Sequence, residues 1–128
     1  EDAGIAPEAV DYIITHGTST PLGDLAELKG IQKVFGEHIY NLNISSTKSM
    51  TGHLLGGAGA VEVLATVMAI TKGVIPPTIN IQELEPAIDP RLNLTQGVAQ
   101  KRDVEYALSN TFGFGGQNST VILKKYHQ

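Results

Sequence analysis

The chain has 128 residues, of which 41% are hydrophobic and 17% charged, and its 13 acidic and 9 basic residues give a net charge of −4 at pH 7. This length and composition are typical of one globular domain with a core of its own, and they argue against a disordered chain. Aromatic residues make up 5%, and no run of Lys or Arg exceeds two residues, so the basic patch and stacking surface of a nucleic-acid binder are missing. The chain has no cysteine, which excludes disulfides and a thiol nucleophile within it.

The longest apolar segment, about Ala58 to Ile70, is interrupted by Glu62 and Thr66. It is shorter than the roughly 20 residues that cross a bilayer, so we expect no membrane span. We also expect a cytoplasmic protein, because no leader-like segment opens the chain. The first residues, "EDAG" (Glu1–Gly4), are typical of a helix that ends at a glycine, which suggests that the chain starts inside an element of a longer protein.

The first half of the chain alternates predicted strands and helices. Residues Ala9–His16, rich in β-branched side chains, predict a buried strand, and Asn41–Thr47 predict a second one. Pro21 suits the first turn of a helix that Gly36 closes. Its apolar residues recur at helical spacing: Leu22, Leu25, Leu28, Ile31 and Phe35. A second helix, apolar on nearly every side, is predicted over about 54–71, and such a helix packs against a sheet.

The second half favours extended structure. Paired prolines in "VIPPTIN" (Val74–Asn80) forbid a helix, and the polar residues 82–100 predict an irregular segment. Two late strands, Val104–Phe114 and Asn118–Tyr126, flank Gly115 and Gly116 as a hairpin. The order β-α-β-α-β-β predicts a single α/β layered domain over residues 1–128, with a mixed sheet that is parallel at first and antiparallel at its last hairpin.

Two of the four histidines stand at positions that suggest a site. His38 and His127 lie in a polar loop and at the terminus, where exposure to solvent explains them. His16 and His53 each adjoin a glycine where a strand gives way to a helix, and ligands of α/β sheets bind beyond the carboxyl ends of strands. A metal site is not supported, because HExxH and a third ligand at suitable spacing are absent. A structural histidine satisfied by one backbone carbonyl is the alternative.

Glu62 is a carboxylate inside an apolar helix, and burying a lone charge costs several kcal/mol unless a cation reaches it. Lys72 stands ten residues further on, about 15 Å along the helix axis, whereas Lys48 lies just before the helix and is the better candidate. The pair is either a structural salt bridge or a device that fixes the surroundings of His53. The positive end of the helix dipole would keep the His53 ring neutral and able to donate a hydrogen bond to an oxyanion.

The glycine-rich segments do not match a phosphate-binding loop. In "GAGAVE" and "GFGGQN", Glu62 and Asn118 occupy the place of the last small residue of the dinucleotide fingerprint. Gly115 and Gly116 instead predict a turn with positive φ angles. Phe114 stands on this glycine loop, where an aromatic side chain can act as a movable gate.

Three motifs, "HGTSTP", "SSTKSMTGHLLG" and "LSNTFGFGGQN", occur in this order. Together they closely resemble the C-terminal half of β-ketoacyl-[acyl-carrier-protein] synthases, the thiolase-like condensing enzymes of fatty acid synthesis, over essentially the whole chain. The resemblance implies an acyltransferase that condenses a malonyl-carrier protein with an acyl-enzyme thioester, with loss of carbon dioxide. It implies no cofactor other than the phosphopantetheine of acyl carrier protein, no metal, and a homodimeric full-length enzyme. The implied partners are acyl carrier protein and the N-terminal half.

The resemblance also assigns roles to eight residues. The catalytic set is His16, His53, Lys48 and Glu62, and the substrate-binding set is Thr18, Thr20, Phe114 and Gly115. The two histidines are expected to bind the malonyl thioester carbonyl, and the lysine and glutamate to pair beside them. The threonines are expected to bond the pantetheine arm, and the aromatic residue to cover the acyl pocket.

A pair of histidines favours an elongating synthase, because initiating synthases carry an asparagine in one place and thiolases a GHP motif with a second cysteine. Here Leu54 follows His53. The family's nucleophilic cysteine belongs to the N-terminal half, so we expect this chain to be inactive alone; its serines lack an evident activating base. The alternatives are a chain-length-factor-like subunit, a polyketide-type ketosynthase and a non-catalytic domain that binds acyl or pantetheine groups. A cysteine upstream favours the catalytic half, and a glutamine there favours the chain-length factor.

Overall fold

Two sheets and two long helices make up residues 2–128, the part of the chain that this computed structural model describes. The strands are β1 (Tyr12–Ile14), β2 (Asn43–Ser45), β3 (Val74–Ile75), β4 (Gln100–Lys101), β5 (Tyr106–Gly113) and β6 (Gln117–Lys124). The α-helices are α1 (Gly23–Phe35), α2 (Lys48–Thr51) and α3 (Ala58–Lys72). Three 3-10 helices are η1 (Pro7–Ala9), η2 (Gly36–Asn41) and η3 (Leu55–Gly57). The predicted β-α-β-α-β-β order is confirmed for β1, α1, β2, α3, β5 and β6, whereas α2, β3 and β4 were not predicted.

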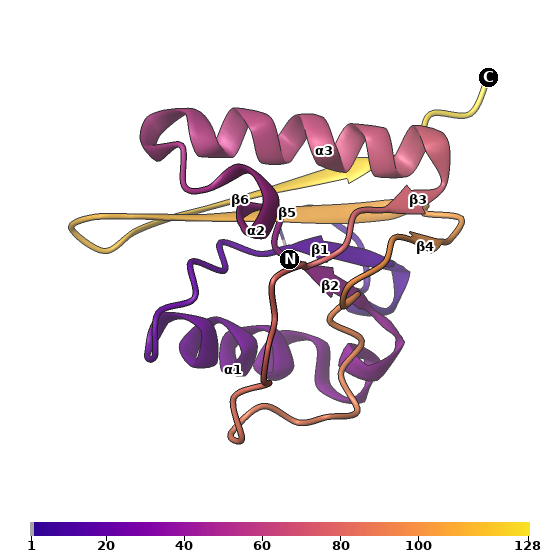
Figure 1. Ribbon diagram of the computed structural model, residues 1–128. Helices are drawn as coiled ribbons and strands as arrows, with labels where there is room; N and C mark the ends of the chain where they lie inside the picture. The colour runs from indigo at the N-terminus through magenta and orange to yellow at the C-terminus, as the bar shows by residue number, and fades with distance from the viewer. Residues whose placement is uncertain (1) are drawn as a thin grey trace.

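The main sheet has the strand order β2-β1-β5-β6 and is mixed, as predicted. β1 runs parallel to both neighbours, and Tyr12 is opposite Asn43 on one side and Ala107 on the other. β5 and β6 form a long antiparallel hairpin at the edge. Figure 1 shows this hairpin as the orange and yellow arrows that run the length of the molecule. β3 and β4 make a small separate antiparallel sheet.

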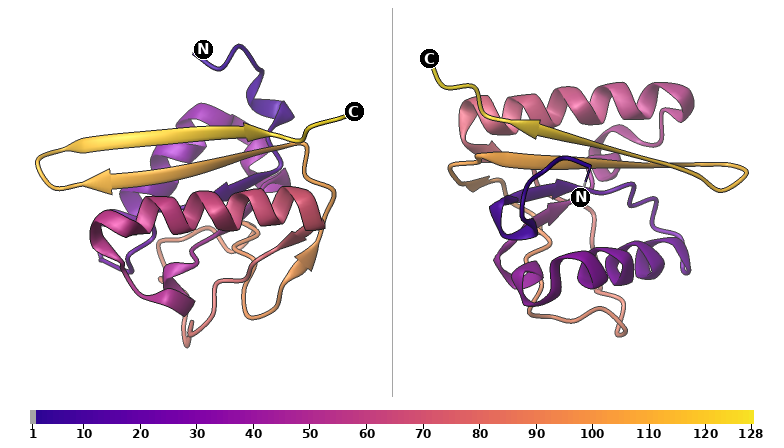
Figure 2. Two further views of the ribbon diagram at one scale, coloured as in Figure 1. Left: turned by 90° about the horizontal axis from the view of Figure 1, so that it is seen from above. Right: turned by 180° about the vertical axis from the view of Figure 1, so that it is seen from behind.

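Helices cover both faces of the main sheet (Figures 1 and 2). The alternation of side chains along β1 divides the core, because successive residues of a strand point to opposite faces. Ile13 belongs to the cluster under α1, which includes Phe35, while Tyr12 and Ile14 belong to the cluster under α3. β1 therefore contributes side chains to the core on both faces of the sheet.

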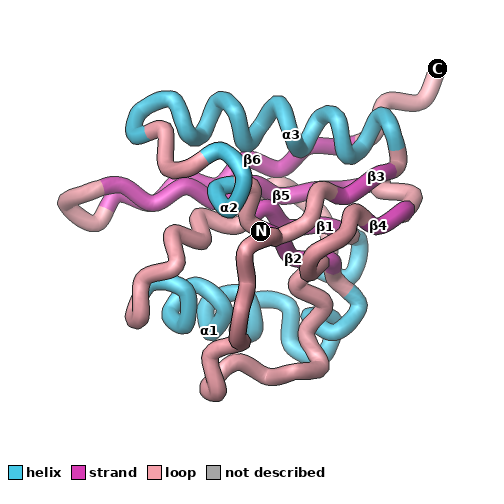
Figure 3. Tube along the Cα trace, in the orientation of Figure 1, coloured by secondary structure: helices cyan, strands magenta, loops and turns pink. Residues whose placement is uncertain are grey.

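Several boundaries differ from the prediction. β1 has three residues instead of eight, because η1 occupies the chain before it and the chain leaves the sheet after Ile14. β2 is shortened in the same way. α1 begins at Gly23, so Pro21 lies before the helix instead of in its first turn, and Leu22 is exposed instead of buried. The irregular segment predicted over 82–100 is confirmed up to residue 99, since Gln100 belongs to β4, and it begins earlier, directly after β3 (Figure 3, pink tube between β3 and β4).

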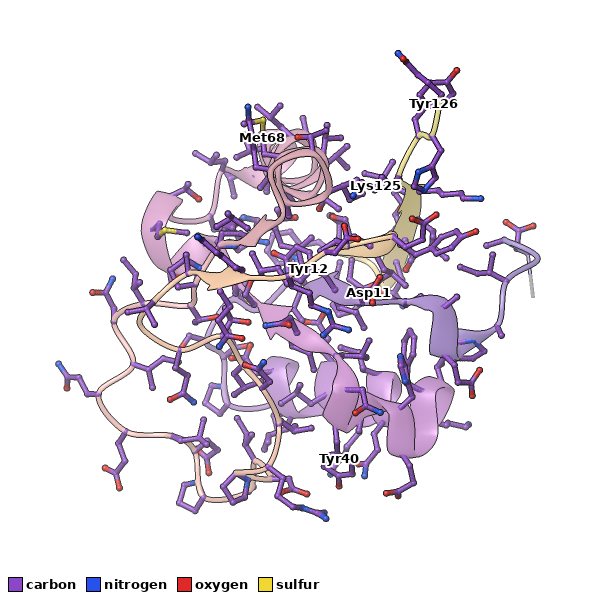
Figure 4. The ribbon with its side chains drawn as sticks, turned by 90° about the vertical axis from the view of Figure 1, so that its right-hand side faces the viewer. Asp11, Tyr12, Tyr40, Met68, Lys125 and Tyr126 are labelled. Atoms are coloured by element: carbon purple, nitrogen blue, oxygen red, sulfur yellow. The ribbon has the colours of Figure 1, made fainter. Side chains whose placement is uncertain are left out.

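The helical stretch Leu55–Lys72, made of η3 and α3, agrees within one residue with the helix predicted over about 54–71, and it is longer than the apolar segment Ala58–Ile70. With 18 residues and a mean hydropathy of 1.3, it is long and apolar enough to cross a membrane by length and composition alone, which corrects the expectation that the segment is too short. That test is weak evidence, since core helices also pass it. Here the helix lies along the sheet, and the side chains of its own residues Glu62 and Thr66 are buried. Figure 4 shows Met68 on the side of α3 turned away from the sheet.

Candidate active site

His16 and His53 come together at one edge of the main sheet. Their ring centroids are 5.4 Å apart and the ring planes are nearly perpendicular, at 89°. His16 follows the carboxyl end of β1, and His53 follows α2, which begins shortly after the end of β2. Because β1 and β2 are parallel neighbours, the loops that leave their carboxyl ends share one edge of the sheet.

Main-chain N–H groups fix the tautomer of both rings. The N–H of Phe112 donates to Nδ1 of His16 at 3.2 Å, and the N–H of Leu55 donates to Nδ1 of His53 at 3.3 Å. A ring nitrogen that accepts an N–H bond carries no proton, so each neutral ring holds its proton on Nε2. The two Nε2–H groups are therefore the donors that the pair can offer to a ligand.

The charge state of His16 is set by its surroundings. Burial lowers the pKa of His16 below its ordinary value of 6.5, and the positive charge of Lys48 and the neighbouring His53 lower it further. The ring is consequently held neutral at the pH of most cells. A neutral imidazole can donate from Nε2 without first losing a proton.

The buried ion pair expected between Lys48 and Glu62 is present. Both side chains are almost completely enclosed, the lysine in α2 and the glutamate on the sheet-facing side of α3. Thr111 of β5 donates from its hydroxyl to the second carboxylate oxygen of Glu62 at 3.4 Å. Through these bonds the ion pair connects α2, α3 and β5.

Thr18 and Thr20, which are expected to bond the substrate arm, lie on the loop between β1 and α1. Their hydroxyl oxygens are 3.4 Å apart. Thr18 lines a cavity of about 1000 Å³, together with His53 and Lys48. The opposite wall comes from residues 78–86 of the irregular segment. Thr20 is not among the residues that line this cavity.

Phe114 lies at the tip of the β5–β6 hairpin and is fully exposed, and the structure does not bring it to the histidines. Gly115 and Gly116 have φ angles of 84° and 78°, so the predicted turn is confirmed. The aromatic residue beside His16 is Phe112, whose ring centroid is 5.4 Å away. Sequence reasoning did not identify it, because its contact depends on how β5 is aligned with β1.

The remaining histidines are separate from the site. His38 is half-buried, and its Nε2 lies 2.9 Å from the carbonyl oxygen of Val10, which corrects the expectation of a solvent-exposed residue. His127 is exposed and lies beside the Glu105 carboxylate at 2.8 Å. Within residues 2–128, no three histidine or acidic side chains come together as a metal site.

Comparisons with known proteins agree with this geometry. Residues 1–82 match the family described as "Beta-ketoacyl synthase, C-terminal domain". The chain is 52% identical, over 126 residues, to the 3-oxoacyl-[acyl-carrier-protein] synthase 2 of Synechocystis sp., and 50% identical, over 124 residues, to that of Coxiella burnetii. These matches cover 98% and 97% of the chain, but only 30% of each relative's length.

Solved structures give the same result for the fold. A β-ketoacyl synthase from Burkholderia phymatum superposes with a TM-score of 0.90 at 39% identity, covering 98% of this chain and 30% of that one. A type II PKS ketosynthase in complex with its acyl-carrier protein superposes with a TM-score of 0.93 at 36% identity, with the same coverage. The thiolase-like α/β fold is therefore confirmed. The residue pattern, the fold and the relatives agree. The chain belongs to the β-ketoacyl synthase family and corresponds to the C-terminal domain of its members.

Proposed function

We propose that this chain is the C-terminal catalytic half of a 3-oxoacyl-[acyl-carrier-protein] synthase that elongates fatty acids by decarboxylative condensation. The observation that carries the proposal is the facing pair of His16 and His53, with both Nδ1 atoms occupied by main-chain donors. The relatives with about 50% identity are named as synthases of this kind.

The proposed chemistry uses the two free Nε2–H groups. When the malonyl thioester loses its carboxylate as carbon dioxide, the electron pair of the broken C–C bond moves into an enolate. The two Nε2–H groups donate to the enolate oxygen, where the negative charge gathers. The enolate carbon then forms a C–C bond to the acyl carbon of a cysteine thioester, and the cysteine thiolate leaves.

The substrate arm is proposed to reach the histidines past the β1–α1 loop. The hydroxyls of Thr18 and Thr20 suit the amides of a phosphopantetheine arm, and the cavity beside Thr18 has room for such a chain. Acyl carrier protein is proposed as the partner, supported by the ketosynthase relative that is described in complex with its own carrier protein. A gating role for Phe114, with Gly115 as its flexible neighbour, stays a prediction from the resemblance.

The nucleophile is proposed to come from the N-terminal half, because this chain has no cysteine. This chain and that half together form the proposed complete enzyme. We expect the 128-residue chain to be inactive alone. That the complete enzyme is a homodimer stays a prediction, and so does its location in the cytoplasm.

The alternatives are less well supported. The type II PKS ketosynthase is 36% identical to this chain, whereas the 3-oxoacyl-[acyl-carrier-protein] synthase 2 of Synechocystis sp. is 52% identical. A chain-length factor does not need both histidines, yet both are present with ordered hydrogen bonds. An upstream cysteine supports the catalytic half, and a glutamine in its place supports the chain-length factor.

The decisive experiment replaces His53 in the complete enzyme. His53→Ala removes one of the two oxyanion donors, so decarboxylation of malonyl-carrier protein is expected to fall by about 10²- to 10³-fold, while transfer of an acyl group to the cysteine continues. Release of carbon dioxide and mass spectrometry of the acyl-enzyme measure the two steps separately. His127→Ala, at an exposed histidine outside the site, is the matched control and should retain both steps. Unchanged decarboxylation in His53→Ala overturns the proposal.

A further inference from the structure

The segment "VIPPTIN" (Val74–Asn80), whose prolines forbid a helix, has no part in the proposed chemistry. It ends at Asn80, whose backbone is left-handed with a φ of 64°. Asparagine adopts this conformation more readily than most residues. Its side-chain amide donates from Nδ2 to the main-chain carbonyl of Ser49, in α2, at 2.9 Å. The amide therefore connects the irregular segment with the short helix that precedes His53.

Two further hydrogen bonds bring Asn80 to this position. The hydroxyl of Thr78 accepts the main-chain N–H of Ser46 at 3.0 Å. The hydroxyl of Ser49 accepts the main-chain N–H of Ile79, also at 3.0 Å. Three consecutive residues of the segment are thus bonded to the turn that opens α2. Ser49 and Asn80 also line the cavity beside the candidate active site, so this contact lies at its edge.

The Ser49 carbonyl lies near the end of α2, where the carbonyls of a helix lose their helical partners. In a continuing α-helix its donor would be the N–H of His53, four residues further on. α2 ends at Thr51 instead, and the chain turns at Gly52, which has a φ of 72° and a ψ of 177°. In the part of the chain that the structure describes, the donor to this carbonyl is the amide of Asn80. Asn80 thus caps α2 from outside the helix.

The end of α2 decides which groups the next residues can bond. Because the helix has ended, the N–H of Leu55 donates to Nδ1 of His53 at 3.3 Å. In a helix that continued past His53, this N–H would donate to the carbonyl of Thr51, four residues earlier. The ring would then lose the donor that fixes its tautomer, and its side chain would leave the backbone in a helical direction.

We propose that Asn80 is a positioning residue for His53, because its amide caps α2 before the helix can include the histidine. The His53 ring can then accept the Leu55 N–H through Nδ1 and point its Nε2–H toward the substrate. The inference rests on the proposed function and deepens it. Asn80 does not act on the reacting atoms, and its contribution is the aim and the tautomer of the ring.

The test is Asn80→Asp in the complete enzyme. Aspartate keeps the shape and the left-handed backbone, but its carboxylate cannot donate to the Ser49 carbonyl. Asn80 is exposed, so the variant is expected to fold. We expect kcat for malonyl decarboxylation to fall by about 10-fold with a smaller change in KM, because a misaimed group slows chemistry more than binding.

Asn80→Gly separates the loss of the amide from the added charge. Glycine also adopts the left-handed backbone, and it removes the donor without introducing a carboxylate. The fall in kcat should therefore be similar in the two variants. A loss confined to Asn80→Asp would assign the effect to the new charge and overturn the inference.

Asn93→Asp is the matched control. Asn93 lies on the same irregular segment, and its Nδ2 donates to the side-chain oxygen of Gln100 at 2.9 Å. It is opposite Asn43, the first residue of β2, and so lies toward the end of that strand away from the histidines. The same substitution removes one side-chain donor here too, but kcat should be retained. An equal loss of kcat in Asn93→Asp and Asn80→Asp would make Asn80 merely structural.

A second readout does not depend on turnover. Nitrogen-15 NMR of labelled histidine reports the tautomer of His53, which should be the single Nε2–H form in the wild type and in Asn93→Asp. Both Asn80 variants should show a mixture of tautomers. A wild type without decarboxylase activity would overturn the proposed function, while the tautomer measurement would still test the cap. An unchanged tautomer in both Asn80 variants overturns the cap, and so does an unchanged kcat.

Discussion

His16 and His53 each have one ring nitrogen occupied by a main-chain N–H, which leaves the other nitrogen to carry a proton toward a ligand. Sequence reasoning could identify both histidines and the Lys48–Glu62 pair. The histidines can be identified because each has a glycine beside it near the end of a strand. The ion pair can be identified because a charge within an apolar helix needs a partner of opposite charge. Phe112 escaped sequence reasoning, because its main-chain N–H reaches Nδ1 of His16 only through the alignment of β5 with β1, which local sequence does not reveal.

The lowered pKa of His16 leads to a prediction about pH. The unfolded state, with a histidine pKa of about 6.5, binds more protons than the folded state between that value and the lower folded pKa. Stability therefore rises with pH through this window and is lost as pH falls through it, until both states are protonated. NMR titration of the complete enzyme should give a His16 midpoint below 6.5.

Replacing both members of the buried pair checks the part of the lowered His16 pKa that comes from the charge of Lys48, burial being the larger cause. Lys48→Met combined with Glu62→Gln removes the cation that disfavours imidazolium, so the His16 midpoint should move upward toward 6.5. The double variant avoids leaving one buried charge unpaired, which would cost about 3–5 kcal/mol. A wild-type midpoint at or above 6.5 contradicts the expected direction.

Elements with strong local signals were predictable, and their ends were not. Helical spacing identified α1 and α3, and the Gly115–Gly116 turn identified the final hairpin. β1 proved shorter than its β-branched run, because η1 takes the residues before it and its pairing with β2 and β5 stops at Ile14. Local sequence shows neither limit. The exposure of Leu22 has a similar origin, since the helix begins only after it.

Two glycines near the start of the chain should respond to alanine in opposite ways. Gly17→Ala places a Cβ against Ser46 at a positive φ, and should destabilise the fold by about 2–4 kcal/mol. Gly30→Ala falls inside α1, where a Cβ meets nothing within 4 Å, and should stabilise it by about 0.5–1 kcal/mol. Denaturant unfolding of the complete enzyme measures both. Equal effects of the same sign would contradict the tight packing of the turn against Ser46.

At the scale of the whole molecule, α3 has one face on the sheet and one face without a partner among the described residues. The uncovered face carries large apolar side chains, namely Leu64, Val67 and Met68, followed toward its start by Leu54 and Leu55. A contiguous apolar surface of this kind drives association. We expect the N-terminal half or a second subunit to cover it in the complete enzyme.

The 128-residue chain alone should therefore form oligomers or aggregates. Light scattering is expected to give a mass well above the 13.6 kDa of one chain, with binding of a dye that detects apolar surface. Leu64→Glu should reduce both signals, because it places a charge in the middle of the exposed face. Val98→Glu, at an equally exposed apolar residue on the irregular segment, is the control and should change neither. A clean monomer without dye binding contradicts the prediction.

The pairing of β1 with β5 also bears on when the site can form. Tyr12 and Ala107 lie side by side in the sheet but 95 positions apart in the chain, and the N–H that orients His16 belongs to Phe112. Closing so long a loop costs entropy before any contact repays it, so contacts of this range form late in folding. During synthesis, His16 is made before β5, and its ring cannot be oriented until β5 has emerged. The arrangement of His16 is thus completed only after β5 has been added, and a growing chain that stops before β5 lacks the N–H that orients this ring.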